Sequence, residues 1–308
     1  MISRRSVRIK VMQVLYSIET INDASDKRIP VKSLGQLLDN TTELMTYLLY
    51  FITEVSRYAE VDAAYRASKN LLSSEDLNVN IKLAGNETVW KIVENSTFKV
   101  AVDHYHCQLN EEGRELIKKT YQKLIATQEY KDYIAEEGRS KKTETSILDF
   151  IFSELMFTDE QFLEFVSENF SSFSDDVEML GKIIISIIHK PQSLNLNEAV
   201  TRDTREYGNT LLKTVLEKQE YISELIKPKL RNWDAERIAH IDMILLQMGV
   251  AELLYFETIP LKVTLNEYID IAKEYSTEQS GQFVNGILDG IRKDLESSNK
   301  LHKIEFRK

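Results

Sequence analysis

The 308-residue sequence is poor in cysteine, proline and glycine. Its single cysteine, Cys107, excludes an internal disulfide and a metal centre built from several thiolates. Only 10 glycines and 4 prolines interrupt the chain, and so few helix breakers favour helices. The most apolar runs, residues 44–52 and 183–188, are much shorter than the ~20 residues that span a bilayer. We therefore expect no membrane partner. Cations and polar residues precede any apolar segment at the N-terminus, so we expect no signal peptide and a cytoplasmic location.

Motifs of common catalytic sites are also missing. The sequence has no glycine-rich phosphate loop, no HExxH or GxSxG motif and no set of protein-kinase motifs. Asp242 and Glu252 are one conceivable acid and base pair, but they are ten residues apart on one predicted helix. At 1.5 Å per residue they are separated by about 15 Å, which is too far to act on one bond. We expect neither an enzyme nor a cofactor.

One short segment, DHYHC at residues 103–107, contains several side chains that can bind metals. On a helix His104, His106 and Cys107 do not share a face, and no second cluster completes a tetrahedral site. Packing of these side chains is the simpler interpretation, so no metal is expected.

The charge is unevenly distributed along the sequence. The net charge of −10 argues against a protein that coats nucleic acid generally. Nevertheless, four cations and no acid precede Glu19. This pattern indicates either a local anion-binding surface or a charged terminus in solvent. The four cations are Arg4, Arg5, Arg8 and Lys10.

The N-terminal segment has the periodicity of an amphipathic helix, and Ser3 is placed to cap it. At about 100° per residue, Arg5, Arg8 and Tyr16 fall on one flank beside the apolar stripe. Cations that contact phosphates and an aromatic ring that stacks on a base are the combination that binds single-stranded RNA. A solvated charged terminus with a half-buried tyrosine is the alternative, and spacing alone does not exclude it.

Helical periodicity continues through most of the remaining sequence, and no convincing run of alternating strand residues occurs. The expected fold class is therefore all-α. Helical patterns cover residues 31–72, 87–107, 111–137, 197–227, 235–256 and 263–275, with dense apolar segments between 147 and 190.

The segment STEQSGQFVNGILD, residues 276–289, changes from polar to apolar. Ser276 and Gln279 have the spacing of a capping box, and Ser280 is a second possible cap, so the polar half is predicted to begin a helix. Phe283 lies at the rim of the following apolar stripe. Gly286 and Gly290 share a face that a neighbouring backbone can approach closely.

Three runs of sequence resemble the NusB family of transcription antitermination factors. They are RRSVRIKVMQVLYSIE at 4–19, WDAERIAHIDMILLQMGVAELL at 233–254, and IPLKVTLNEYIDIAKEYSTEQSGQFVNGILD at 259–289. The resemblance implies an all-α, NusB-like helical bundle of two small subdomains plus an inserted helical unit. It divides the chain into the first helix of the core (1–21), an inserted helical unit without a family counterpart (22–144), the remainder of the N-terminal subdomain (145–230) and the C-terminal subdomain (231–308).

The same resemblance implies a binding function without catalysis. Proteins of this family pair with NusE, a small-subunit ribosomal protein, and bind boxA-type RNA within an RNA polymerase antitermination complex on ribosomal RNA operons. Asp242 lies on the helix that helps to hold NusE in the family. The residues that correspond to the RNA surface are Arg4, Arg5, Arg8, Tyr16, Gln279 and Phe283.

This sequence departs from the family pattern at two positions of the polar turn. Gln279 replaces an acid found in many relatives, and Gln282 replaces a basic residue, so the net effect on affinity for RNA is open. A second hypothesis also remains: a helical protein–protein scaffold or homodimer in which residues 22–144 are the working part and RNA binding is weak.

Overall fold

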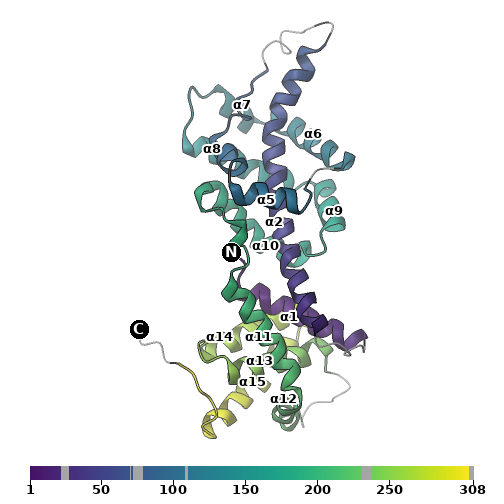
Figure 1. Ribbon diagram of the computed structural model, residues 1–308, viewed down its shortest axis with the longest axis vertical. Coiled ribbons are helices and arrows are strands. Elements are labelled where there is room, and N and C mark those ends of the chain that lie inside the picture. Colours follow the sequence, from purple (N-terminus) through teal and green to yellow (C-terminus); the bar gives the residue numbers. More distant parts are fainter. Residues whose placement is uncertain (22–27, 70, 72–78, 108–109, 231–237, 305–308) are drawn as a thin grey trace. The chain divides into compact units, whose positions relative to one another are not determined.

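The computed structural model describes residues 1–21, 28–69, 71, 79–107, 110–230 and 238–304, and in this part of the chain helices are the only regular secondary structure (Figure 1). The predicted all-α class is confirmed. No helix in the described ranges is long and apolar enough to cross a membrane.

The described chain divides into two compact units. The split unit combines Ile2–Leu38 with Thr201–Lys308, and the central unit consists of Asp39–Val200 together with Met1. Helix α2 contributes its first residues to the split unit and the rest to the central unit. The other helices of the split unit are α1 (Arg4–Ile21), α11 (Arg202–Glu217), α12 (Gln219–Ile226), the short 3₁₀ helix η4 (Lys227–Leu230), α13 (His240–Tyr255), α14 (Leu261–Tyr275) and α15 (Ser280–Ser297).

Helix α13 lies at the centre of the split unit. Its residues are apolar on nearly all sides, and Leu245, Met248 and Leu253 are fully buried, as expected of a helix surrounded by protein. It packs against α1, α11, α12, α14 and α15, and these helices lie around it in Figure 1. Glu252 is also fully buried on α13, so a charge in this core requires compensation.

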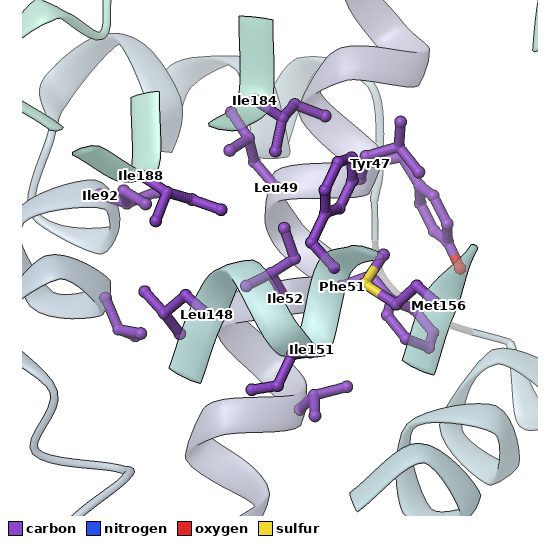
Figure 2. Close-up of a cluster of buried hydrophobic side chains, with 14 of the residues drawn as sticks. Tyr47, Leu49, Phe51, Ile52, Ile92, Leu148, Ile151, Met156, Ile184 and Ile188 are labelled. Carbon is purple, nitrogen blue, oxygen red and sulfur yellow. The ribbon is translucent and has the colours of Figure 1, made fainter. Parts of the chain in front are cut away.

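The central unit forms its core around α2 (Arg28–Ala67). Figure 2 shows Leu49, Phe51 and Ile52 of α2 directed toward side chains from other helices, including Leu148 and Ile184. The helices that enclose α2 in this unit are α4 (Glu87–Val93), α5 (Ser96–His104), α6 (Glu111–Ala126), α7 (Gln128–Ala135), α8 (Lys141–Phe150), the π-helix η1 (Ile151–Met156), α9 (Glu160–Asn169) and α10 (Phe173–His189), followed by the 3₁₀ turns η2 (Pro191–Ser193) and η3 (Leu196–Glu198).

Several predicted helices are divided in the structure by capping side chains. The pattern at 87–107 breaks at Asn95, whose carboxamide oxygen accepts hydrogen bonds from the backbone N–H groups of Thr97 and Phe98. The pattern at 111–137 breaks at Thr127, whose hydroxyl accepts from the N–H of Tyr130. Apolar periodicity continues across such breaks because both helices face the same core, so periodicity alone does not reveal them.

The compact units do not follow the boundaries expected from the sequence. Residues 145–200, predicted to belong with 201–230, pack with the segment from Asp39 onward. Their apolar side chains, among them Ile151, Phe162 and Ile184, share a core with α2, α4 and α6. The predicted boundaries at 21/22 and 230/231 adjoin residues 22–27 and 231–237, which lie outside the described residues. The correspondence of each segment to a family subdomain stays a prediction.

This division bears on any attempt to remove residues 22–144 as a separate insertion. Such a deletion removes Leu34 and Leu38, which are fully buried in the split unit. It also removes the α2 side chains that fill the core around residues 145–200. A chain lacking 22–144 is therefore expected to lose both cores.

Glycines provide a test of close packing in the split unit. A Cβ on Gly208 would lie 2.6 Å from Cγ1 of Val7, whereas a Cβ on Gly286 meets no atom within 4 Å. The predicted close approach at Gly286 and Gly290 is wrong, because a Cβ at Gly290 meets only the side chain of Lys229, at 3.6 Å or more. Tighter contacts lie at Gly208 and at Gly249, where a Cβ would be 2.9 Å from the side chain of Leu288.

We expect Gly286→Ala to raise the free energy of unfolding by about 0.5–1 kcal/mol, since alanine stabilises a helix interior relative to glycine. Gly208→Ala should lower it by about 1–2 kcal/mol, because overpacking outweighs the same gain in helix propensity. Denaturant unfolding of the two variants measures both effects. Equal changes in the free energy of unfolding of the two variants would contradict the conclusion that Gly208 is closely packed and Gly286 is not.

Candidate nucleic-acid interface

Helix α1 begins where the sequence predicts, and Ser3 accepts a hydrogen bond from the N–H of Ser6 at 3.2 Å. Its third predicted RNA-binding arginine, however, is not on the surface. Arg8 is 2% exposed, and its Nε and Nη2 atoms donate to the two carboxylate oxygens of Glu252, each at 2.9 Å. The prediction that Arg8 contacts RNA is therefore corrected: this guanidinium compensates the buried charge on α13.

Hydroxyl groups complete the hydrogen bonding of Glu252. Tyr207, Thr264 and Tyr268 donate to the carboxylate at 2.5, 2.8 and 3.2 Å. Burial by itself raises the pKa of Glu252, but the hydrogen bonds and charge of Arg8, with the hydroxyls of Tyr207 and Thr264, outweigh it and bring the pKa below its ordinary value. This network joins α1, α11, α13 and α14 and fixes the position of the helix that carries the exposed arginines.

Arg4 and Arg5 remain accessible, with 42% and 35% of their side chains exposed. Arg4 pairs with Asp203 at 3.0 Å, and Arg5 pairs with Glu274 at 2.8 Å. Exposed pairs of this kind contribute only about 0–1 kcal/mol. An approaching phosphate can therefore compete with the carboxylates for these guanidinium groups.

Tyr16 is 43% exposed, as a ring that stacks on a base requires. The Tyr16 ring contacts the imidazole of His240 in a T-shaped arrangement, with the two ring centroids 5.6 Å apart and the ring planes at 75°. Nε2 of His240 lies 2.6 Å from a carboxylate oxygen of Glu19, and about half of the histidine side chain is exposed. Sequence analysis missed His240, because nothing in the pattern places the start of α13 against the end of α1.

The surface of α1 is not continuous between Arg5 and Tyr16. Residues 6–12 are all buried, and eleven residues correspond to about 16 Å along the helix axis. The predicted flank is thus two exposed patches, one at each end of α1.

The start of α15 differs from its prediction. The helix begins at Ser280, and Gln279 occupies the N-cap position without a side-chain capping bond, so the capping box from Ser276 to Gln279 does not form. The hydroxyl of Ser280 donates to a carboxylate oxygen of Asp242 at 2.7 Å, which joins the first turns of α15 and α13. Gln279 is exposed and remains available.

Phe283 and Asp242, in contrast, are 5% and 4% exposed. Phe283 faces the core because it lies one turn from both Ser280 and Ile287, which are buried on the same side of α15, and Asp242 is engaged by Ser280. Neither side chain is available to RNA or to a partner in this conformation. The predictions of direct contact are corrected to roles in positioning α13 and α15.

These contacts define the candidate surface as Arg4 and Arg5 at one end of α1, with Tyr16, His240 and Gln279 as the other exposed members. In the described ranges, no group of three or more His, Cys, Asp or Glu side chains is arranged to hold a metal ion. Cys107 is buried, and burial raises the pKa of its thiol to about 12, so it is neither a reactive nucleophile nor a ready ligand.

The sequence from within α10 to α15 also matches known proteins. The family described as "NusB family" matches residues 178–293. A transcription antitermination protein NusB from Ruminiclostridium cellulolyticum is 31% identical over 133 residues, which cover 42% of this chain and 92% of that protein. The chain belongs to the NusB family.

Two further NusB proteins are more similar over shorter segments. Those from Salinibacter ruber and Methylacidiphilum infernorum are 45% and 48% identical, over 32% and 27% of this chain. The chain spans 62% and 58% of their lengths. A solved NusB structure from T. maritima is 35% identical with a TM-score of 0.30, covering 36% of this chain and 75% of that one.

Proposed function

We propose that this protein is a transcription antitermination factor that binds boxA-type single-stranded RNA together with NusE, as part of an RNA polymerase complex that reads through ribosomal RNA operons. Similarity to NusB over almost the whole Ruminiclostridium protein is the observation that carries this proposal. The proposed role is binding and involves no chemical step.

The candidate surface supports RNA binding through two kinds of contact. Arg4 and Arg5 supply positive charge for phosphates, and Tyr16, beside His240, supplies an exposed ring for a base. Gln279, which is exposed just before the first turn of α15, offers a further polar side chain. The carboxylates of Asp203 and Glu274 partly neutralise the arginines, so we expect strong binding only when NusE adds its own contacts.

The test is an RNA titration of the full chain, alone and with NusE, using Arg4→Gln, Arg5→Gln and Tyr16→Ala combined. These exposed positions should not affect folding, and affinity should fall at least about tenfold, as one lost stack and two lost phosphate contacts imply. The slope of log affinity against log salt should become shallower by about 0.7 for each lost phosphate contact.

A matched control removes the same charges and one exposed ring elsewhere: Arg57→Gln, Lys213→Gln and Tyr65→Ala, all at exposed positions. Its affinity should stay close to that of the unchanged protein. Equal losses in both triple variants would refute the assignment of the surface, and no binding by the unchanged protein with NusE present would refute the function.

A further inference from the structure

A groove in the central unit, between α6 and α9, is lined by carboxylates. It encloses about 480 Å³. Glu112, Glu164 and Glu168 are exposed there and form no ion pair with any described residue, and Lys119 is the only cation among its lining residues. One turn beyond Lys119 on α6, Lys123 pairs with Asp159 at 2.6 Å. The residues that line it are Glu112, Glu115, Leu116, Lys119, Gln161, Glu164, Phe165 and Glu168.

Beside the groove lies a smaller pocket of about 210 Å³. Phe165 lines both spaces, and Asn110 before α6 and Asn169 at the end of α9 border the pocket. Pocket and groove therefore adjoin at Phe165, and the two together are called the channel below. From Asn110 to Lys119 it measures about 13 Å at 1.5 Å per residue, the length of about four extended residues.

The pocket contains an unsatisfied polar group. Tyr47 is 5% exposed, and its hydroxyl has no hydrogen-bond partner in the described structure. Leaving such a group unpaired costs about 1–3 kcal/mol. Glu43 precedes Tyr47 by one helical turn of α2, which places both side chains on the same face. Burial raises the pKa of the Glu43 carboxyl, and the charge of His104 only partly offsets this.

Aromatic rings form the remaining wall of the pocket. The rings of Phe165 and Phe170 have centroids 6.0 and 4.8 Å from that of Tyr47, and Tyr105 also lines the space. Aromatic rings beside a carboxylate and a free phenol attract an organic cation through its charge and its N–H donors. The carboxylates along the groove repel phosphate, so the channel does not suit nucleic acid.

We propose that this channel binds an extended lysine- or arginine-rich segment of a partner protein. One cationic side chain enters the pocket, where it pairs with Glu43 and donates to the hydroxyl of Tyr47. The neighbouring cations of the segment pair with Glu112, Glu164 and Glu168. This site lies in the central unit, within residues 39–200, and is separate from the candidate RNA surface.

The test is fluorescence anisotropy with the full chain and labelled pentalysine, pentaarginine and pentaglutamate. The two cationic peptides should bind and pentaglutamate should not. Glu164→Lys combined with Glu168→Lys should weaken binding of the cationic peptides at least about tenfold, because attraction becomes repulsion. The control Glu94→Lys with Glu129→Lys changes the net charge equally at exposed positions away from the channel, and it should bind within about twofold of the unchanged protein.

A second variant tests the pocket without a change of charge. Tyr47→Phe removes a hydroxyl that has no partner, so thermal stability should stay equal or rise, while affinity for pentalysine should fall about three- to tenfold. Unchanged affinity of Tyr47→Phe, equal losses in the groove and control variants, or equal binding of pentaglutamate would each overturn the proposal. RNA affinity should be the same in the groove and control variants, whose net charges are equal, and unchanged in Tyr47→Phe, so failure here is distinguishable from failure of the proposed function.

Discussion

Replacing Glu252 with alanine is expected to lower the stability of the split unit by about 3–5 kcal/mol, the typical cost of leaving one charge of a buried pair without its partner. Arg8 would keep its guanidinium at a position that is 2% exposed, without the two 2.9 Å bonds that it makes to Glu252. The hydroxyls of Tyr207, Thr264 and Tyr268 would also lose their common acceptor.

Hydrogen exchange measures this effect within the split unit, since amides of α11 and α13 report its local free energy of unfolding. A double variant with methionine at both Arg8 and Glu252 should recover much of the loss, because it buries no unpaired charge. The double-mutant cycle then gives the coupling between the two side chains. A loss below about 1 kcal/mol in Glu252→Ala would contradict the importance of the pair.

The same pair predicts a dependence on pH. The pKa of Glu252 is lower in the folded protein than its ordinary value, so its ionised form stabilises the fold. That contribution is fully present above the unfolded pKa of about 4.3 and is lost as pH falls through the lower folded pKa. Glu252→Gln should therefore be less stable than the unchanged protein near neutral pH, and the difference should shrink in acid.

Arg8 also shows what a sequence pattern can and cannot predict. Helical periodicity placed α1 and its Ser3 cap correctly, because local backbone geometry and an amphipathic stripe are both encoded within a few residues. The same geometry placed Arg8 on a flank. Its burial depends on Glu252, which is 244 residues away in sequence, and no local pattern contains that partner.

Only part of the candidate surface could be predicted from the sequence, because some of its contacts join residues that are far apart along the chain. Tyr16 and Gln279 are exposed and Arg5 is about one-third exposed, because each lies near a helix end or on the polar side of its helix. His240 was missed, since its contact with Tyr16 arises only when α13 packs beside α1. Phe283 was placed at the rim of its stripe, and whether a rim position is buried depends on the helices that pack beside it, which the local pattern does not contain.

Phe162→Ala is expected to lower the stability of the central unit by about 3–5 kcal/mol. The ring is fully buried, and its centroid lies 4.7 Å from that of Phe51 on α2. Its removal leaves a cavity between α9 and α2 that close-packed neighbours fill only partly. Val100→Ala, at a position 63% exposed, is the control and should change stability by less than about 0.5 kcal/mol.

The helices that lose stability in Phe162→Ala show which residues belong to the central unit. Residues 145–200 share their core with α2, α4 and α6, so Phe162→Ala should accelerate amide exchange in α6, α8 and α10. Helix α11 packs instead on α1 and α13, and its amides should keep their protection. If residues 145–230 formed one folding unit, as the sequence suggested, α11 would lose protection together with α10. Exchange that accelerates in α10 and not in α11 would place the boundary at 200/201.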